Sequence, residues 1–220
     1  MANDTWPTHN LAIATVASMK KWDRKPADLY ETPEEATQAA LNFLRWDKEG
    51  TIAEPACGGG KIARMLERNG YKVEAGDLFN QGYGTPGLDF RTTPVEYAFC
   101  RRLMTNPPFK HALEFARLAL GEYEFEDVAL LLKSNYFHTD NRIALFEMFP
   151  PTVELKITWR LPFLKEERGD APLMDCSWFV WKRGAPRQGF NILRKPSNVP
   201  PLTELLSVAI ARNLEARRGG

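Results

Sequence analysis

Short apolar runs of strand length alternate along the chain with longer stretches in which apolar residues recur at helical spacing. The strand-length runs lie at residues 51–54, 71–76, 88–90, 103–105 and 128–133, and the helical stretches lie near 33–46, 61–69, 110–120 and 141–149. This alternation predicts an α/β fold with a mostly parallel sheet and helices on both faces. Two later runs, 153–159 and 177–182, are close enough to pair as an antiparallel C-terminal hairpin, which gives seven strands in all.

The start of the first helix carries its own signal. Thr32 precedes Pro33, and Glu35 lies three residues after Thr32, as in a capping box with proline in the first turn. We therefore predict a helix that begins here and runs to about Trp46.

The same pattern divides the chain into three parts. Residues 1–28 are mixed in character and are expected to form a flexible N-terminal segment, whereas residues 29–184 carry the alternating pattern and are expected to form one folded domain. Residues 185–220 are expected to form a basic tail, in which a proline-bearing linker leads to a short amphipathic helix at 202–214.

The composition adds exclusions. With 220 residues, 44% hydrophobic and 26% charged, the chain can bury the core of a soluble globular domain. No apolar run of about 18 residues and no secretory signal are visible, so we expect no membrane span and a cytoplasmic protein. The three cysteines are odd in number and widely spaced, and the three histidines lack the spacing of metal ligands. We expect neither a disulfide framework nor a metal site.

The charge is unevenly distributed. The net charge of +1 does not by itself indicate nucleic-acid binding. From Lys182 to the end of the sequence, however, there are eight basic residues and only two acidic ones. This excess is suited to contact phosphate, and it is equally suited to a solvated tail.

The tetrapeptide Asn106-Pro107-Pro108-Phe109 follows a predicted buried strand. Two prolines fix the backbone and remove two N–H donors, which leaves a rigid turn with carbonyl oxygens, one amide side chain and one aromatic face. An exocyclic amino group on a planar base or amide needs acceptors in its plane and a stacking surface beside it. An ordinary strand-to-loop turn explains the same residues.

A glycine-rich turn, residues 54–60, lies between the first predicted strand and the next helix. Such a turn lets the backbone approach a ligand closely. A phosphate-binding loop is excluded because Lys61 is followed by Ile62, and the third glycine of a dinucleotide fingerprint is missing. The acidic Glu54 at the entrance suits a cationic ligand without phosphate, such as S-adenosylmethionine, although a plain glycine loop is the simpler alternative.

With these motifs in this order, residues 29–184 resemble the S-adenosylmethionine-dependent DNA adenine-N6 methyltransferases, in the compact form common in phages and prophages. The resemblance implies a Rossmann-like class I methyltransferase domain in a bacterial cell or a phage-infected host, acting in restriction–modification or a related role. It assigns catalysis to Asn106, Pro107, Pro108 and Phe109. It assigns cofactor binding to Thr32, Pro33, Glu54, Ala56, Gly58, Gly60, Asp77, Leu78, Asp89, Phe90 and Asn106.

The resemblance also suggests two substrate contacts. A base flipped out of a duplex needs a second wall opposite Phe109, and Phe163 is the candidate. Lys133 ends a predicted buried strand and is placed to point toward the site, although a solvated strand end is an alternative. Because the chain has no room for a target-recognition domain of usual size, DNA contacts are expected from short loops such as 80–87 or 163–173, from the N-terminal segment, from the basic tail or from the second subunit of a homodimer.

Several alternative functions are compatible with the same tetrapeptide. Adenine in RNA and the side-chain amide of a protein glutamine both present a planar amino group to such a tetrapeptide. A methyltransferase-like module that binds nucleic acid without catalysis is a non-enzymatic alternative. A cytosine-C5 methyltransferase is excluded because no cysteine directly follows a proline.

Overall fold

The computed structural model describes residues 30–123, 125–161 and 174–196. They contain one eight-stranded sheet with the order β3-β2-β1-β4-β5-β7-β6-β8. The strands are β1 (Thr51–Glu54), β2 (Lys72–Asp77), β3 (Thr85–Pro86), β4 (Arg102–Thr105), β5 (Asp127–Lys133), β6 (Val153–Ile157), β7 (Cys176–Lys182) and β8 (Gly189–Leu193). Strand β7 is antiparallel to β5 and β6, and the other neighbouring strands are parallel.

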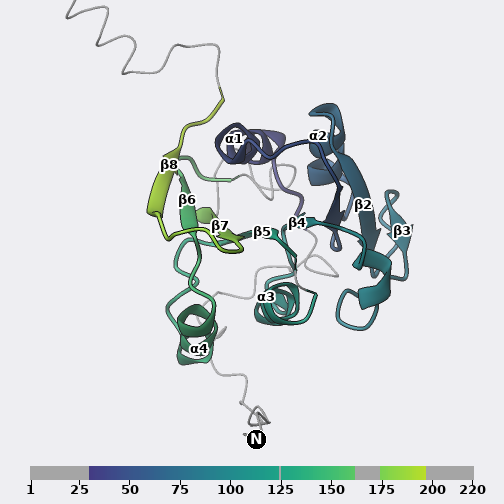
Figure 1. Ribbon diagram of the computed structural model, residues 1–220. Helices are drawn as coiled ribbons and strands as arrows, with labels where there is room; N and C mark the ends of the chain where they lie inside the picture. The colour runs from purple at the N-terminus through teal and green to yellow at the C-terminus, as the bar shows by residue number, and fades with distance from the viewer. Residues whose placement is uncertain (1–29, 124, 162–173, 197–220) are drawn as a thin grey trace, which may run out of the picture.

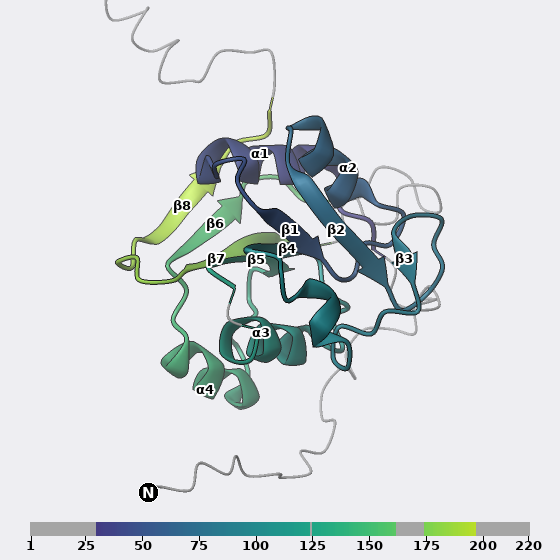
Figure 2. The same ribbon diagram turned by 45° about the vertical axis from the view of Figure 1, so that its right-hand side comes forward.

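The helices lie on both sides of this sheet. Helices α1 and α2 cover one face, and α3 and α4 lie on the other (Figure 1, Figure 2). Their bounds are α1 (Glu34–Leu44), α2 (Lys61–Arg68), α3 (Ala112–Gly121) and α4 (Asp140–Met148), and the short 3-10 helix η2 (Pro94–Tyr97) precedes β4. The predicted α/β architecture and the antiparallel pairing of the two late strands are confirmed.

Each face of the sheet buries a separate core. Ile52 and Trp178 belong to the cluster beneath α1 and α2, whereas their chain neighbours Ala53 and Phe179 belong to the cluster on the α3 side. This is the alternation expected of strands covered on both faces. The Trp178 indole also donates a hydrogen bond to the carbonyl of Ala36, 3.1 Å away, which ties α1 to the sheet.

The prediction of a third strand at 88–90 was wrong. The strand on the outer side of β2 is β3, a few residues before 88–90. Residues 88–90 lead into a turn, in which the carbonyl of Asp89 accepts hydrogen bonds from the amides of Thr92 and Thr93. Phe90 is only 1% exposed and packs against Phe115 on α3, with ring centroids 4.8 Å apart. The apolar run therefore marks a core anchor in a turn.

The count of seven strands was also wrong, because an eighth strand lies beyond residue 184. Strand β8 pairs in parallel with β6, so the sheet extends into the segment 185–220 that we assigned to a tail. Its pattern was weak in the sequence because β8 is an edge strand, where Phe190 and Ile192 stay exposed and only Leu193 is buried. Residues 1–29, which include the whole N-terminal segment 1–28, and the predicted helix 202–214 lie outside the described residues.

The predicted capping box does not form. Helix α1 begins at Glu34 with Pro33 as its N-cap and no capping side chain, and it ends at Leu44 rather than near Trp46. The hydroxyl of Thr32 is buried without a hydrogen-bond partner among the described residues. Thr32 therefore does not cap the helix.

The two edges of the sheet differ in character. At the carboxyl edge, the parallel strands β1, β2 and β4 end at Glu54, at Asp77 and just before Asn106. In such sheets this edge is where ligands bind.

Among the described residues, no helix is long and apolar enough to cross a membrane.

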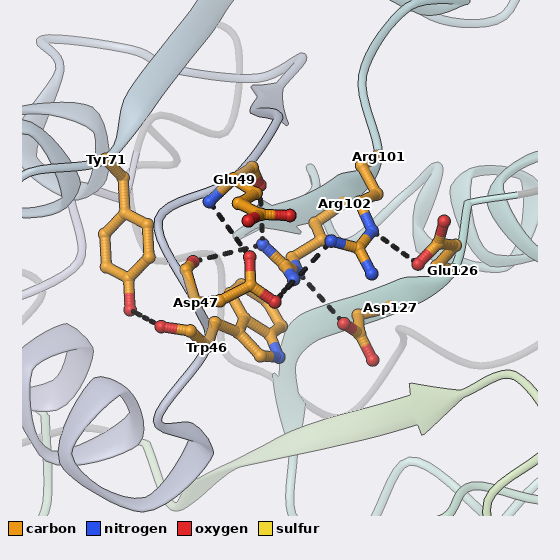
Figure 3. Close-up of polar contacts among 8 residues, drawn as sticks. All are labelled: Trp46, Asp47, Glu49, Tyr71, Arg101, Arg102, Glu126 and Asp127. Carbon is orange, nitrogen blue, oxygen red and sulfur yellow. Dashed lines mark hydrogen bonds and ion pairs between the residues drawn. The ribbon is translucent and has the colours of Figure 1, made fainter.

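At the opposite edge, ion pairs connect the starts of β4 and β5 with the loop after α1 (Figure 3). Arg102, the first residue of β4, bonds Asp127, the first residue of β5, at 3.0 Å and Asp47 at 2.6 Å. Its remaining donors reach the backbone carbonyls of Asp47 and Glu49. Arg102 and Asp127 are 3% and 4% exposed, so each buried charge is compensated by its ion-pair partner rather than by water.

Candidate functional site

A pocket opens at the carboxyl edge of the sheet. Four parts of the chain meet there: the approach to α1, the glycine turn with the start of α2, the end of β2 and the turn after β4. The lining residues are Tyr30, Glu31, Thr32, Glu54, Ala56, Cys57, Gly58, Lys61, Ile62, Asp77, Asn106, Pro107, Pro108 and Phe109. The structure thus brings both sequence motifs to one place.

The glycine turn is shaped by its close neighbours. Gly60 has a φ of 82° and lies under the ring of Tyr83, where a β-carbon would come within 2.3 Å of the ring. At Gly59 a β-carbon would come within 2.1 Å of the Glu31 carboxylate. Glycine is required at Gly60, where φ is positive and the ring is close, whereas at Gly59 the flexible Glu31 side chain would have to move. Glu31 also forms a 2.9 Å ion pair with Lys61, so the approach to α1 is held against this turn.

Glu54 is the most unusual ionisable group in the pocket. It is 1% exposed, and burial raises the pKa of its carboxyl well above the usual range, against a smaller opposite effect of the hydrogen bond with the Ala63 backbone. Its Oε2 atom has no hydrogen-bond partner among the described residues. A buried acceptor in this state is costly unless a ligand satisfies it.

Thr32 presents a second unsatisfied atom to the same pocket. Its side-chain oxygen is buried and, within the described part of the chain, has no partner. Both oxygens line the pocket and could therefore bond to a polar ligand there.

Replacing Glu54 with glutamine is expected to raise the thermal stability of the ligand-free protein. The folded-state pKa of Glu54 lies above its unfolded value, so its stabilising contribution is complete below about pH 4.5 and is lost as pH rises toward the folded pKa. Glu54→Gln removes this loss, and each kcal/mol regained raises Tm by roughly 2–4 °C. The measurement is Tm from pH 4.5 to 8 for both proteins. The exposed Glu96 on η2 supplies the control: an equal gain in Glu96→Gln would contradict the assignment to burial.

The turn after β4 presents the groups expected for amino-group recognition. The amide nitrogen of Asn106 donates a hydrogen bond of 2.8 Å to the carbonyl of Tyr30. This leaves the side-chain oxygen of Asn106 as the atom that can accept a hydrogen bond. The ring of Phe109 is partly exposed and has its centroid 5.4 Å from that of Tyr30. Lys133, from the end of β5, places its ammonium 5.2 Å from the Phe109 centroid and so reaches the site.

Asp77 also occupies the position expected from the sequence. It lines the pocket, and its carboxylate accepts hydrogen bonds from the amides of Gly58 and Phe79, each at 2.9 Å. The first of these bonds couples the end of β2 to the glycine turn. The neighbouring Leu78 is 44% exposed and is not part of the lining.

Other predicted cofactor residues lie outside the pocket lining. Asp89 forms a two-point ion pair with Arg91, whose guanidinium holds the pKa of that carboxyl below its usual range. Phe90 is in the core. Pro33 serves as the N-cap of α1, and Gly60 lies beneath Tyr83. The proposed second wall, Phe163, lies outside the described residues.

Sequence reasoning gave no site role to five lining residues, namely Tyr30, Glu31, Cys57, Lys61 and Ile62. Tyr30 and Glu31 directly precede the predicted cofactor residues Thr32 and Pro33, and Lys61 and Ile62 served only as evidence against a phosphate loop. Cys57 lines the pocket too, but burial, followed by the charges of nearby acids, raises the pKa of its thiol to about 12. It is therefore a neutral thiol and not a nucleophile. The described residues contain no cluster of His, Cys, Asp or Glu that could hold a metal ion.

Comparison with known proteins identifies the fold. No family model and no curated protein matches the chain. Among solved structures, it is similar to a candidate RNA methyltransferase, PH1948 of Pyrococcus horikoshii, with 18% identity and a TM-score of 0.54 over 76% of this chain and 93% of that one. It is also similar to the type I restriction–modification methyltransferase subunit of Streptococcus thermophilus, with 13% identity and a TM-score of 0.53 over 82% of this chain and 52% of that one.

A third similar structure is the modification subunit of a candidate type I restriction enzyme from Vibrio vulnificus YJ016. It shows 14% identity and a TM-score of 0.50 over 78% of this chain and 48% of that one. The fold is that of these methyltransferases. The chain spans about half the length of the two restriction–modification subunits, at 48% and 52% of their residues.

Proposed function

We propose that the protein transfers the methyl group of S-adenosylmethionine to the N6 amino group of adenine in DNA. One observation carries this proposal. The amide nitrogen of Asn106 donates a hydrogen bond to the Tyr30 carbonyl, so its oxygen is left to accept a hydrogen bond beside an aromatic ring. That acceptor borders the pocket in which Glu54 and Thr32 present their unsatisfied oxygens.

The pocket chemistry fits S-adenosylmethionine. This cofactor carries a sulfonium and an ammonium but no phosphate, and the lining offers the carboxyls of Glu54 and Asp77. The orphaned Oε2 of Glu54 and hydroxyl of Thr32 are acceptors that its ammonium and hydroxyl groups can satisfy. Ligand binding would also shift Glu54 toward its charged form, because a nearby positive charge favours the carboxylate.

Entry of a ligand of this size requires the pocket to widen. Its enclosed volume is about 50 Å³, whereas small-molecule pockets typically measure roughly 300–1,000 Å³. The ion pair between Glu31 and Lys61 is the lining contact best suited to open, because both side chains are partly exposed, at 36% and 46%. Exposed pairs of this kind contribute only about 0–1 kcal/mol.

The residues of the turn have distinct roles in the proposed reaction. When bound, S-adenosylmethionine supplies a methyl group already activated by the sulfonium. The side-chain oxygen of Asn106 and the carbonyl of Pro107 accept hydrogen bonds from the two amino N–H groups, which draws electron density toward the nitrogen and aligns it for attack. Phe109 stacks against the base, a contact worth about 1–3 kcal/mol in comparable sites. The nitrogen gains the methyl group and then releases one proton to solvent.

The preference for DNA has separate support. Two structures with this fold are methylation subunits of type I restriction systems. A third is named as a candidate RNA methyltransferase, so adenine in RNA is the outcome most in need of a direct test. Protein glutamine presents the same planar amino group and is covered by the same experiment.

Nucleoside mass spectrometry tests the substrate and the reaction together. The protein is expressed in a host without adenine methylation, and digested DNA and RNA are analysed beside those of the Asn106→Ala variant. We expect N6-methyldeoxyadenosine in DNA with the wild type and none with the variant. Methyladenosine in RNA alone would move the proposal to RNA. Absence from both pools, together with label transferred from S-adenosylmethionine to protein, would replace it with amide methylation.

A further inference from the structure

Tyr30 connects the cofactor side of the pocket with the catalytic turn. It precedes Glu31, which pairs with Lys61 on the glycine turn, and Thr32, whose hydroxyl is buried at the pocket. Tyr30 itself touches the other side, through both its backbone and its ring. Three consecutive residues therefore border the two halves of the site.

The backbone contact of Tyr30 fixes the orientation of a side chain. An asparagine amide can be turned so that either its oxygen or its nitrogen faces a given direction. A carbonyl can only accept, so the carbonyl of Tyr30 at 2.8 Å selects the orientation in which the Asn106 nitrogen faces Tyr30. The oxygen is then directed away from Tyr30, where it can accept a hydrogen bond from a substrate amino group.

The ring contact of Tyr30 supports the stacking surface. The rings of Tyr30 and Phe109 have centroids 5.4 Å apart and are tilted by 38°. This separation leaves no room for a base between the two rings, since stacked groups need about 3.5 Å on each side. Tyr30 therefore packs against Phe109 from the side and limits the movement of that ring.

From these contacts we propose that Tyr30 is a positioning residue, which orients the Asn106 amide and holds the Phe109 ring for the target base. This proposal rests on the proposed methyl transfer to adenine. Tyr30 acts through two other residues and needs no contact with the reacting atoms. Its ring keeps the segment in place, and its carbonyl sets the direction of the Asn106 acceptor.

Two substitutions at Tyr30 separate the ring from the hydroxyl. Tyr30→Phe keeps the ring and the carbonyl, so its kcat is expected to stay within about twofold of the wild type. Tyr30→Ala keeps the carbonyl but removes the ring that holds it. Its kcat is expected to fall by about tenfold to a hundredfold, the order found when a reacting group is misplaced by about 1 Å. Phe190→Ala is the matched control, because it removes a ring that is 61% exposed on β8.

The measurements are kcat and KM for unmethylated DNA, the dissociation constant of S-adenosylhomocysteine and Tm. We expect Tyr30→Ala to lower kcat while Tm and the dissociation constant change little, and Tyr30→Phe to recover the rate. Loss of cofactor affinity with an unchanged kcat would overturn the positioning role, as would wild-type kcat in Tyr30→Ala. If the wild type itself methylates no adenine, the proposed function fails, and this result is distinct from a failure at Tyr30.

Discussion

Replacing Arg102 with methionine is expected to lower the free energy of unfolding by about 3–5 kcal/mol, the usual cost of removing one partner from a buried ion pair. The substitution leaves the carboxylate of Asp127, 4% exposed, without its cation. One oxygen of Asp127 already lacks a hydrogen-bond partner among the described residues, so the aspartate has no second donor to fall back on. The change in stability would be measured by denaturant unfolding.

The adjacent arginine provides the control for this experiment. Arg101 is 37% exposed and pairs with Glu126 and Asp47, which are 53% and 51% exposed (Figure 3). Arg101→Met is therefore expected to cost about 0–1 kcal/mol, as exposed pairs do. Replacing Arg102 and Asp127 together by apolar residues should recover much of the loss, because a buried pair is often no more stabilising than an apolar pair. Equal losses in Arg101→Met and Arg102→Met would contradict this explanation.

Asn106→Ala is expected to reduce the rate of methyl transfer by about two to three orders of magnitude, by analogy with the loss of one hydrogen-bonding group in an oxyanion hole. The variant loses the acceptor that draws electron density to the amino nitrogen, whereas Glu54, Thr32 and Asp77 still line the pocket. Cofactor affinity should therefore change far less than the rate. Single-turnover kinetics with unmethylated DNA and calorimetry with S-adenosylhomocysteine measure the two quantities separately.

An isosteric change at the same position provides the control for orientation. Asn106→Asp keeps the shape and one acceptor, but it replaces the amide nitrogen with an oxygen that would face the Tyr30 carbonyl at the present 2.8 Å. Two acceptors repel at this distance. The ionised Asn106→Asp variant is therefore expected to transfer the methyl group as slowly as Asn106→Ala. Wild-type rates in either variant would show that the Asn106 side chain is not required.

The sequence predicted the parts of the fold that depend on simple periodicity. The buried strands β1, β4 and β5 are apolar runs bounded by turns, so their order along the chain implied a parallel sheet with its carboxyl ends at one edge. The juxtaposition of Glu54, Asp77 and Asn106 followed from that rule alone, and the pocket contains all three.

Other features depend on contacts that periodicity does not reveal. Asp89 was predicted to bind the cofactor, and its carboxylate also forms an ion pair with Arg91 that the sequence did not indicate. The role of Tyr30 could not be foreseen because its partner Asn106 is 76 residues away, and the relevant atom is a backbone carbonyl common to every residue type. Strand β8 buries a single side chain, so its residues carry almost no strand periodicity.

The place of β7 in the sheet has a consequence for folding. This strand is formed by residues 176–182, yet it lies between β5 and β6 and pairs with both. Until β7 is synthesised, the outer edge of β5 has no partner strand. The leucines at the centre of β5 also lack the neighbouring side chains of Trp178 and Phe179, which are buried in the folded protein. The nascent chain therefore exposes an apolar strand edge over a long stretch of translation, a state prone to aggregation. Strand β6 reaches β5 only through β7, so β6 joins the rest of the sheet in a late step of high contact order, and β8 is added to β6 after that.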